Sequence, residues 1–242
     1  MEFSTPLIPG RLVRRWNRFL SEVELEDGSG IVRAHCPNPG SMMGLKEAGL
    51  RVWLEPNDDP KKKLKYGWRL VEFGNGHWSG IDTAVPNRVV KEALLARAIA
   101  PLAAYDEVNP EVKYGTNSRV DFRLAGPGLP DAYVEVKNVH LRRDGDWAEF
   151  PDSVTARGAK HLGELIEVAA TGGRAVMLYL IQRTDCARLK MAGDLDPVYS
   201  DAFEAAAEAG VDMLAYGTRI DTSGVLLGER MPVFRADGRE FK

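Results

Sequence analysis

The periodicity of the apolar residues changes near residue 83. Before it, short segments in which apolar and polar residues alternate are separated by Gly, Pro, Asn and Asp, as in strands joined by turns. After it, segments with helical spacing alternate with β segments. We therefore expect two domains, one over residues 1–82 and one over residues 83–242.

Five short β segments are predicted in the first domain, with a turn at Asp27–Gly30. They cover residues 7–25, 31–36, 50–56, 68–73 and 77–82. Five short strands in so small a domain predict a closed barrel, and an OB-like β-barrel is the simplest arrangement.

The second domain is predicted to run α-β-β-β-α-β-α-β. The helices are expected over residues 88–100, 153–171 and 196–210, and the strands over residues 108–115, 118–126, 131–141, 174–182 and 211–220. Asn87 is the expected N-cap of the first helix, and Asp152 or Ser153 that of the second. This order predicts an α/β (α+β) fold with a mixed sheet flanked by helices.

Basic residues gather in the first domain although the chain has a net charge of −3. Residues 1–80 hold 12 Lys and Arg against 10 Asp and Glu, and residues 81–242 hold 20 against 25. Arg14, Arg15 and Arg18 surround Trp16, which predicts a surface where a base stacks on the indole and arginines grip the backbone. Lys61, Lys62, Lys63 and Lys65 form a second cluster. The alternative for either cluster is a solvated basic surface.

Three charged residues interrupt two apolar β segments of the second domain. Glu135 and Lys137 are two positions apart, so their side chains point to the same face of a strand, while Val134 and Val136 point into the core. Asp121 lies on the preceding strand, which is expected to form a hairpin with this one through residues 126–128. All three charges then converge on one face of the sheet.

Convergent carboxylates repel each other, and a divalent cation relieves this repulsion. Mg²⁺ accepts one or two carboxylates and keeps several waters, so Asp121 and Glu135 are candidate ligands of Mg²⁺ or Mn²⁺, with the Val136 carbonyl between the strand positions as a further ligand. Lys137 could orient or deprotonate an attacking water. We predict a nuclease-type catalytic site, for which a surface ion pair between Glu135 and Lys137 is the alternative.

Glu92 on the preceding helix is a further catalytic and metal-binding candidate, with a helix-surface carboxylate as the alternative. Arg157 and Lys160 are candidate phosphate contacts on the helix that follows the motif, although Lys160 and Glu164 are also spaced for an ion pair. His161 is expected to pack or to support a ligand rather than to bind metal.

Asp121, Glu135 and Lys137, in an α-β-β-β-α-β frame, resemble the motif of the PD-(D/E)xK nuclease superfamily, and Glu92 is similar to the acidic residue of its first helix. Over nearly its whole length the chain resembles the sugar fermentation stimulation protein A family. The shared segments include HCPNPGSM at 35–42, NRVVKEAL at 87–94, YVEVKNV at 133–139 and FPDSVTARGAKHLGEL at 150–165. The resemblance implies an N-terminal OB-fold, a restriction-endonuclease-like second domain, DNA binding and nuclease activity.

Two other functions compete with a DNA-binding nuclease. A DNA-binding transcriptional regulator of sugar-utilisation genes would use the same fold without cutting. A glycoside hydrolase would also need two carboxylates, but the adjacent lysine and the basic first domain suit a phosphodiester better.

The cell compartment and the partners follow from simpler features. Two distant cysteines, Cys36 and Cys186, and an N-terminus unlike a signal peptide favour the cytoplasm. No segment approaches the roughly 18 apolar residues of a membrane helix. DNA, single- or double-stranded, is the expected partner, and an exposed sheet edge could pair two copies as a homodimer.

Overall fold

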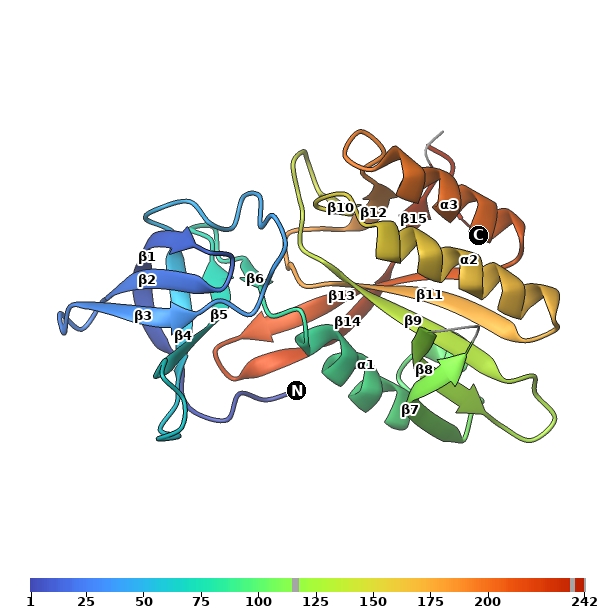
Figure 1. Cartoon of the computed structure of the whole chain (residues 1–242), viewed down its shortest axis with the longest axis horizontal. Coiled ribbons are helices and arrows are strands. Elements are labelled where there is room, and N and C mark those ends of the chain that lie inside the picture. The colour runs from blue at the N-terminus through green and yellow to red at the C-terminus, as the bar shows by residue number, and fades with distance from the viewer. Residues whose placement is uncertain (115–117, 236–237, 242) are drawn as a thin grey trace.

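The structure is a computed structural model that describes residues 1–114, 118–235 and 238–241. A small β-barrel and a larger α/β part lie side by side along the longest axis (Figure 1). In the described residues, no helix is long and apolar enough to cross a membrane.

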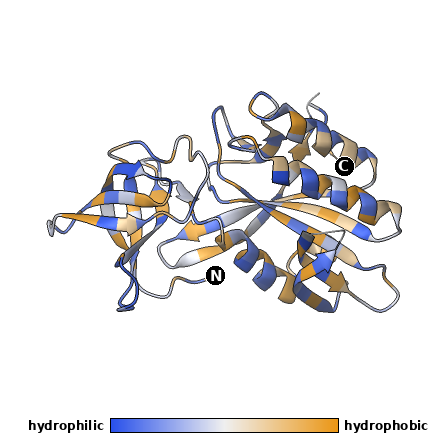
Figure 2. Cartoon of the chain, viewed as in Figure 1, coloured by the Kyte–Doolittle hydropathy of each residue, from blue (hydrophilic) through white to orange (hydrophobic). Residues whose placement is uncertain are grey.

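The first part is the predicted OB-like barrel. Its strands are β1 (Ile8–Trp16), β2 (Leu20–Leu25), β3 (Ile31–His35), β4 (Arg51–Pro56), β5 (Tyr66–Glu72) and β6 (Trp78–Gly80). They are ordered β3-β2-β1-β4-β5-β6, and an additional pairing of β3 with β5 closes the barrel. Alternate residues point inward, where Trp68 is the largest buried side chain of the barrel core. Figure 2 shows the resulting alternation of hydrophobic and hydrophilic positions.

The prediction of one strand over residues 7–25 was wrong. The segment forms β1 and β2, which are antiparallel and joined by a tight turn. Asn17 and Arg18 in this turn have positive φ angles of 48° and 60°. Asn tolerates this backbone conformation, so Asn17 was the sequence signal for the turn.

The second part is the predicted mixed sheet between helices. Its elements are α1 (Val85–Leu95), a 3₁₀ turn (Ala100–Leu102), β7 (Glu107–Tyr114), β8 (Ser118–Ala125), β9 (Ala132–Val139), β10 (Trp147–Phe150), α2 (Ala156–Ala170), β11 (Arg174–Ile181), β12 (Arg188–Met191), α3 (Pro197–Glu208), β13 (Asp212–Asp221), β14 (Gly224–Met231) and β15 (Val233–Phe234). The main sheet has the order β14-β13-β11-β9-β8-β7, with β9, β11 and β13 parallel.

Two apolar cores lie on opposite faces of this sheet. Val176, Leu178 and Leu180 of β11 pack in the core beneath α1, whereas Met177 and Tyr179 pack in the core beneath α2 and α3. Figure 1 shows α1 on one side of the sheet and α2 with α3 on the other. The fully buried β11 explains the nearly continuous apolar run in its sequence.

Several predicted details of the second part were wrong. The strands β10, β12 and β15, which form a small separate sheet, and the edge strand β14 were not predicted. They are short or rich in polar residues, so they carry little period-two signal. Gly115, at the end of one predicted strand, lies outside the described residues.

The predicted helix caps also differ from the structure. The N-cap of α1 is Ala84, without a side-chain hydrogen bond, rather than Asn87. In α2, Thr155 takes the place predicted for Asp152 or Ser153, and its hydroxyl accepts a hydrogen bond from the Gly158 N–H. The side chains of Asn87 and Asp152 instead form long-range contacts, which local capping rules do not reveal.

The barrel and the second part share apolar and backbone contacts. Leu7 and Leu70 of the barrel belong to the core beneath α1, and Trp53 and Trp78 pack against it. Glu2 pairs with Gly224 at the edge of the second sheet, so the first residues of the chain cross to the other part. The division at residues 82 and 83 falls between β6 and α1, and as a division into domains it stays a prediction.

Edge strand β7 carries two features that oppose pairing with another copy. Pro110 lacks a backbone N–H, and Glu111 has a φ of 56°, which distorts the strand locally. The homodimer stays a prediction, and β7 is a poor edge for it.

Both cysteines are buried and free, Cys36 in the barrel core and Cys186 in the core beneath α2 and α3. Burial raises the pKa of the Cys36 thiol and raises that of Cys186 to about 12. We expect no fast-reacting thiol when the native protein meets a colourimetric thiol reagent at pH 8, and two after unfolding in guanidinium. A fast-reacting thiol in the native protein would contradict this burial.

Candidate active site

The candidate site forms where β8 and β9 separate. Their pairing ends at Phe122 and Val134, so the next residues along the two strands no longer exchange ladder hydrogen bonds. The Asp121 side chain fills this gap, and its Oδ2 accepts a hydrogen bond from the Val136 N–H at 2.7 Å. Because the N–H and C=O of a strand residue point to the same side, the Val136 carbonyl faces the same gap.

Asp121 is held from a second side by α1. Asn87 Nδ2 donates to Asp121 Oδ1 at 2.7 Å. Burial raises the pKa of the Asp121 carboxyl, and the nearby charge of Glu135 raises it further, against the hydrogen bonds from Val136 and Asn87. The two carboxylates therefore repel each other across the site.

Glu135 is 3% exposed and lies beneath α2. Its Oε1 accepts from Lys137 Nζ at 2.8 Å and forms a short contact with His161 Nδ1. Burial alone would raise the pKa of this carboxyl, but His161 and Lys137 outweigh burial and lower it. In the described part of the chain no hydrogen-bond donor reaches its buried Oε2.

Helix α2 brings two further groups to Glu135. Arg157 Nε donates to His161 Nε2 at 3.2 Å, so Nε2 acts as the acceptor and the ring proton lies on Nδ1, toward Glu135. Arg157 and His161 are one helical turn apart and share a face of α2. The two predicted groups thus meet: the exposed Arg157 contacts His161, and its role as a phosphate contact stays a prediction.

Tyr114 is a site residue that the sequence did not indicate. Its hydroxyl donates to Glu164 Oε2 at 3.4 Å. Burial raises the pKa of Tyr114, and the charges of Glu135, Glu164 and Asp121 raise it further. Lys160 pairs with Glu164 at 3.3 Å, which is the ion pair that its spacing offered as an alternative.

Glu92 is not brought together with Asp121 and Glu135. Its side chain is 57% exposed and binds the N-terminal ammonium of Met1 at 2.6 Å. Glu92 lies five positions after Asn87, which places it about 140° around the helix from the side chain that holds Asp121. Within the residues that the structure describes, no group of three or more His, Cys, Asp or Glu side chains is arranged to hold a metal ion.

The predicted nucleic-acid contacts of the barrel fall into two groups. The Arg14 guanidinium lies 5.0 Å from the centroid of the Trp16 ring, and that of Arg33 lies 6.0 Å away, so the three residues form one basic aromatic patch. Arg15 instead turns inward, where its Nη2 donates to the carbonyls of Arg18, Asn38 and Gly40. Arg18 is exposed in the turn after β1.

Comparisons with known proteins agree over most of the chain. Residues 13–81 match the family described as SfsA N-terminal OB domain, and residues 84–224 match the sugar fermentation stimulation protein RE domain. A sugar fermentation stimulation protein homolog of Dinoroseobacter shibae is 70% identical over 96% of each chain. One from Agrobacterium fabrum is 49% identical over 93% of this chain and 96% of that one.

A solved structure, described as Pyrococcus furiosus SfsA in complex with Ca²⁺, is 27% identical. The structural alignment covers 96% of this chain and 97% of the Pyrococcus furiosus chain, with a TM-score of 0.85.

Proposed function

This chain belongs to the sugar fermentation stimulation protein family, and we propose that it binds DNA and hydrolyses phosphodiester bonds with a divalent cation, Mg²⁺ or Mn²⁺, held by Asp121 and Glu135. The observation that carries the proposal is the buried Glu135 Oε2, which lacks a donor in the described residues and lies in a site with a second, repelling carboxylate. A buried carboxylate oxygen without a partner is costly, and a cation would satisfy it.

The residues present fit a hard cation. Each carboxylate oxygen has two lone pairs, so Asp121 can keep its hydrogen bonds to Asn87 and Val136 and still bind a metal. Mg²⁺ needs one or two carboxylates when water completes its shell, and the Val136 carbonyl can add one more oxygen. The Pyrococcus furiosus relative is described in complex with Ca²⁺, another oxygen-seeking cation.

A bound cation would supply charge for a phosphoryl oxygen and a lower pKa for the attacking water. Lys137, held beside Glu135 at 2.8 Å, would orient that water or stabilise the developing negative charge. His161 would hold Glu135 in place from α2, because its Nδ1 proton points toward the carboxylate and Arg157 occupies its other nitrogen.

The barrel would bind the nucleic acid. OB folds use the loops after their first and fourth strands, together with the second and third strands, to bind oligonucleotides. In this chain the first of these loops carries Arg18 and the other carries the lysine cluster at residues 61–65. Figure 2 shows the loop between β4 and β5 as a hydrophilic tip of the barrel. Both loops flank the end of β3, since His35 pairs with Leu20 after the first loop and with Gly67 after the other.

A DNA-binding regulator that does not cut is the second candidate. Lys137 already pairs with Glu135 and His161 donates a hydrogen bond to it, so part of the Glu135 charge is neutralised by Lys137 without a metal. The relatives' name, sugar fermentation stimulation protein homolog, also suggests a regulator. A cleavage assay separates the candidates: labelled single- and double-stranded DNA and RNA are incubated with the protein in Mg²⁺, Mn²⁺ or EDTA. Metal-dependent cutting favours the nuclease, and retained binding without cutting favours the regulator.

Replacing Trp16 with Ala should weaken DNA binding, because stacking of one base on an aromatic ring contributes roughly 1–3 kcal/mol. We expect an affinity loss of about tenfold in fluorescence anisotropy with single-stranded DNA in EDTA. Trp147→Ala is a matched control, since Trp147 also lies beside two cations, Arg188 and Lys190, but in the second part. Equal losses in both variants would remove Trp16 from the proposed DNA surface.

A further inference from the structure

A basic pocket lies where the barrel meets the second part. It has a volume of about 310 Å³, and its polar lining consists of Arg15, Arg18, Ser41, Lys46 and Ser153. The first four belong to the barrel, whereas Ser153 precedes α2. We call it the junction pocket, because the side chains of both parts contribute to its wall.

Arg15 and residues 39–41 of the following loop line the junction pocket. Arg15 Nη2 donates hydrogen bonds to the carbonyls of Asn38 at 2.7 Å, Gly40 at 3.1 Å and Arg18 at 2.9 Å. Gly40 lies so close to the second part that a Cβ there would come within 2.9 Å of Asp152 Oδ2. The Nε of Arg15 is buried, and no acceptor in the described part of the chain reaches it.

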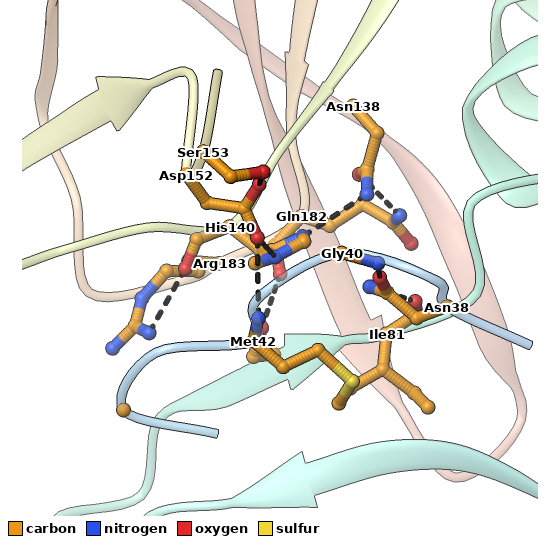
Figure 3. A network of polar contacts seen from close by, with 12 residues as sticks. Asn38, Gly40, Met42, Ile81, Asn138, His140, Asp152, Ser153, Gln182 and Arg183 are labelled. Carbon is orange, nitrogen blue, oxygen red and sulfur yellow. Dashed lines mark hydrogen bonds and ion pairs between the residues drawn. The ribbon is translucent and has the colours of Figure 1, made fainter. Parts of the chain in front are cut away.

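The charge of the junction pocket is positive. Its lining holds two arginines and a lysine, and none of its lining residues in the described chain is acidic. Two nearby carboxylates already have partners. Asp152 is occupied by the Met42 N–H at 3.1 Å and His140 Nε2 at 3.2 Å (Figure 3), and Glu47 Oε2 accepts from the Lys46 N–H at 3.0 Å. Arginine, lysine and serine hydroxyls are groups that proteins use to bind phosphate oxygens.

A chain of hydrogen bonds connects this pocket to the strand that carries Glu135 and Lys137. Ser153 Oγ donates to Asp152 Oδ1 at 3.2 Å, and Asp152 contacts His140. Asn138 of β9, next to Lys137, lies 3.0 Å from His140 Nδ1 and accepts from Gln182 Nε2 at 2.6 Å (Figure 3). The junction pocket therefore has a fixed position relative to the candidate active site.

We propose that the junction pocket holds one backbone phosphate of the nucleic-acid strand and so sets the path of that strand from the barrel toward Glu135 and Lys137. This inference rests on the proposed function, because it assumes that the chain binds nucleic acid. A backbone phosphate would accept hydrogen bonds from Lys46, Arg18 and the Ser41 hydroxyl, and it would offset the charge of Arg15. The Ser153 hydroxyl keeps its hydrogen bond to Asp152 and closes the wall of the pocket.

Salt-dependent DNA binding tests the pocket without any need for cleavage. Affinity for labelled DNA is measured by anisotropy in EDTA over a series of salt concentrations, for the intact chain and for Lys46→Gln and Arg18→Gln. Log affinity falls as log salt rises. Each variant should make this negative slope shallower by about 0.9 on duplex DNA or about 0.7 on a single strand. The matched control is Arg97→Gln, which removes an exposed arginine of the second part that pairs with Asp106.

A second pair of variants tests whether the pocket excludes negative charge at its Ser153 wall. Ser153→Glu puts a carboxylate into the junction pocket and should lower affinity more than about tenfold. Val198→Glu adds the same charge at an exposed position of α3 and should leave affinity unchanged. Thermal unfolding of each variant checks that it is folded.

The outcomes are distinct. If the intact chain binds no nucleic acid, both the proposed function and the pocket assignment fall. If it binds, but the pocket variants behave like Arg97→Gln and Val198→Glu, the pocket assignment alone falls. If millimolar inorganic phosphate raises the melting temperature of the intact chain but not of Lys46→Gln, while DNA affinity is equal in both, the pocket holds a free phosphate and the backbone assignment is overturned.

Discussion

Glu135→Gln should abolish metal-dependent cleavage and leave DNA affinity in EDTA unchanged. The substitution keeps the shape of the side chain but removes the charge that would hold the cation, and with it the Lewis-acid contribution of several kcal/mol. We expect a loss of roughly 10³-fold or more in single-turnover cleavage rate. DNA binding should persist, because the basic groups that would grip the backbone lie on the barrel.

The control must separate lost catalysis from lost stability. Glu149 is also 3% exposed and is held by two cations, Arg143 at 2.6 Å and Lys190 at 3.3 Å, but it lies on β10 in the small sheet. Removing the charge of Glu135 or of Glu149 breaks a buried ion pair, so both substitutions should be destabilising. Glu149→Gln should therefore lower the melting temperature and retain cleavage. A Glu135→Gln protein that cuts at the original rate would show that the catalytic site lies elsewhere.

The strand positions of Asp121, Glu135 and Lys137 could be predicted because their signal is local. Side chains alternate between the two faces of a strand, so a charged residue among apolar ones indicates which face it lies on. The hairpin between β8 and β9 follows from the glycines between them. Both the barrel and the mixed sheet depend on the same short-range periodicity. These features need no knowledge of how distant elements pack.

The partners of these residues could not be predicted, because they come from helices whose rotation is set by packing. Nothing local distinguishes Asn87 from Glu92, yet α1 turns Asn87 toward Asp121 and leaves Glu92 on the surface. On α2, the spacing of Arg157 and His161 indicates a shared face, but only the contact of α2 with β9 identifies Glu135 as the partner of His161. Tyr114 likewise contacts Glu164 of α2, a partner that the sequence around Tyr114 does not indicate.

Asp152 illustrates how a local rule is overridden. Its position before a helical segment predicts a cap, yet the carboxylate joins the barrel to the second part through Met42 and His140. Burial alone would raise the pKa of Asp152, but the hydrogen bond from His140, its charge and the Met42 N–H lower it to about 2. The ordinary value is 3.8, so the folded chain favours the charged form.

Asp152→Asn should therefore destabilise the fold by about 2 kcal/mol at pH 7, the free energy that corresponds to this difference in pKa. The unfolded chain takes up the proton first as the pH falls, so the stabilisation is complete above about pH 5 and is lost between about pH 4 and pH 2. Urea unfolding followed by tryptophan fluorescence should show a large difference between Asp152→Asn and the intact chain at pH 7. The difference should become smaller at pH 3.

Asp194 is the matched comparison, because its pKa is also lowered to about 2, by a hydrogen bond from Arg143. The side chain of Asp194 is 62% exposed, against 18% for Asp152, so solvent screens its ion pair. Asp194→Asn should leave the free energy of unfolding nearly unchanged at both pH values. If the two variants lose equal stability, the Asp152 contacts do not hold the barrel to the second part. A larger, pH-dependent loss for Asp152 alone would mean that the same carboxylate both fixes the position of the junction pocket and stabilises the fold.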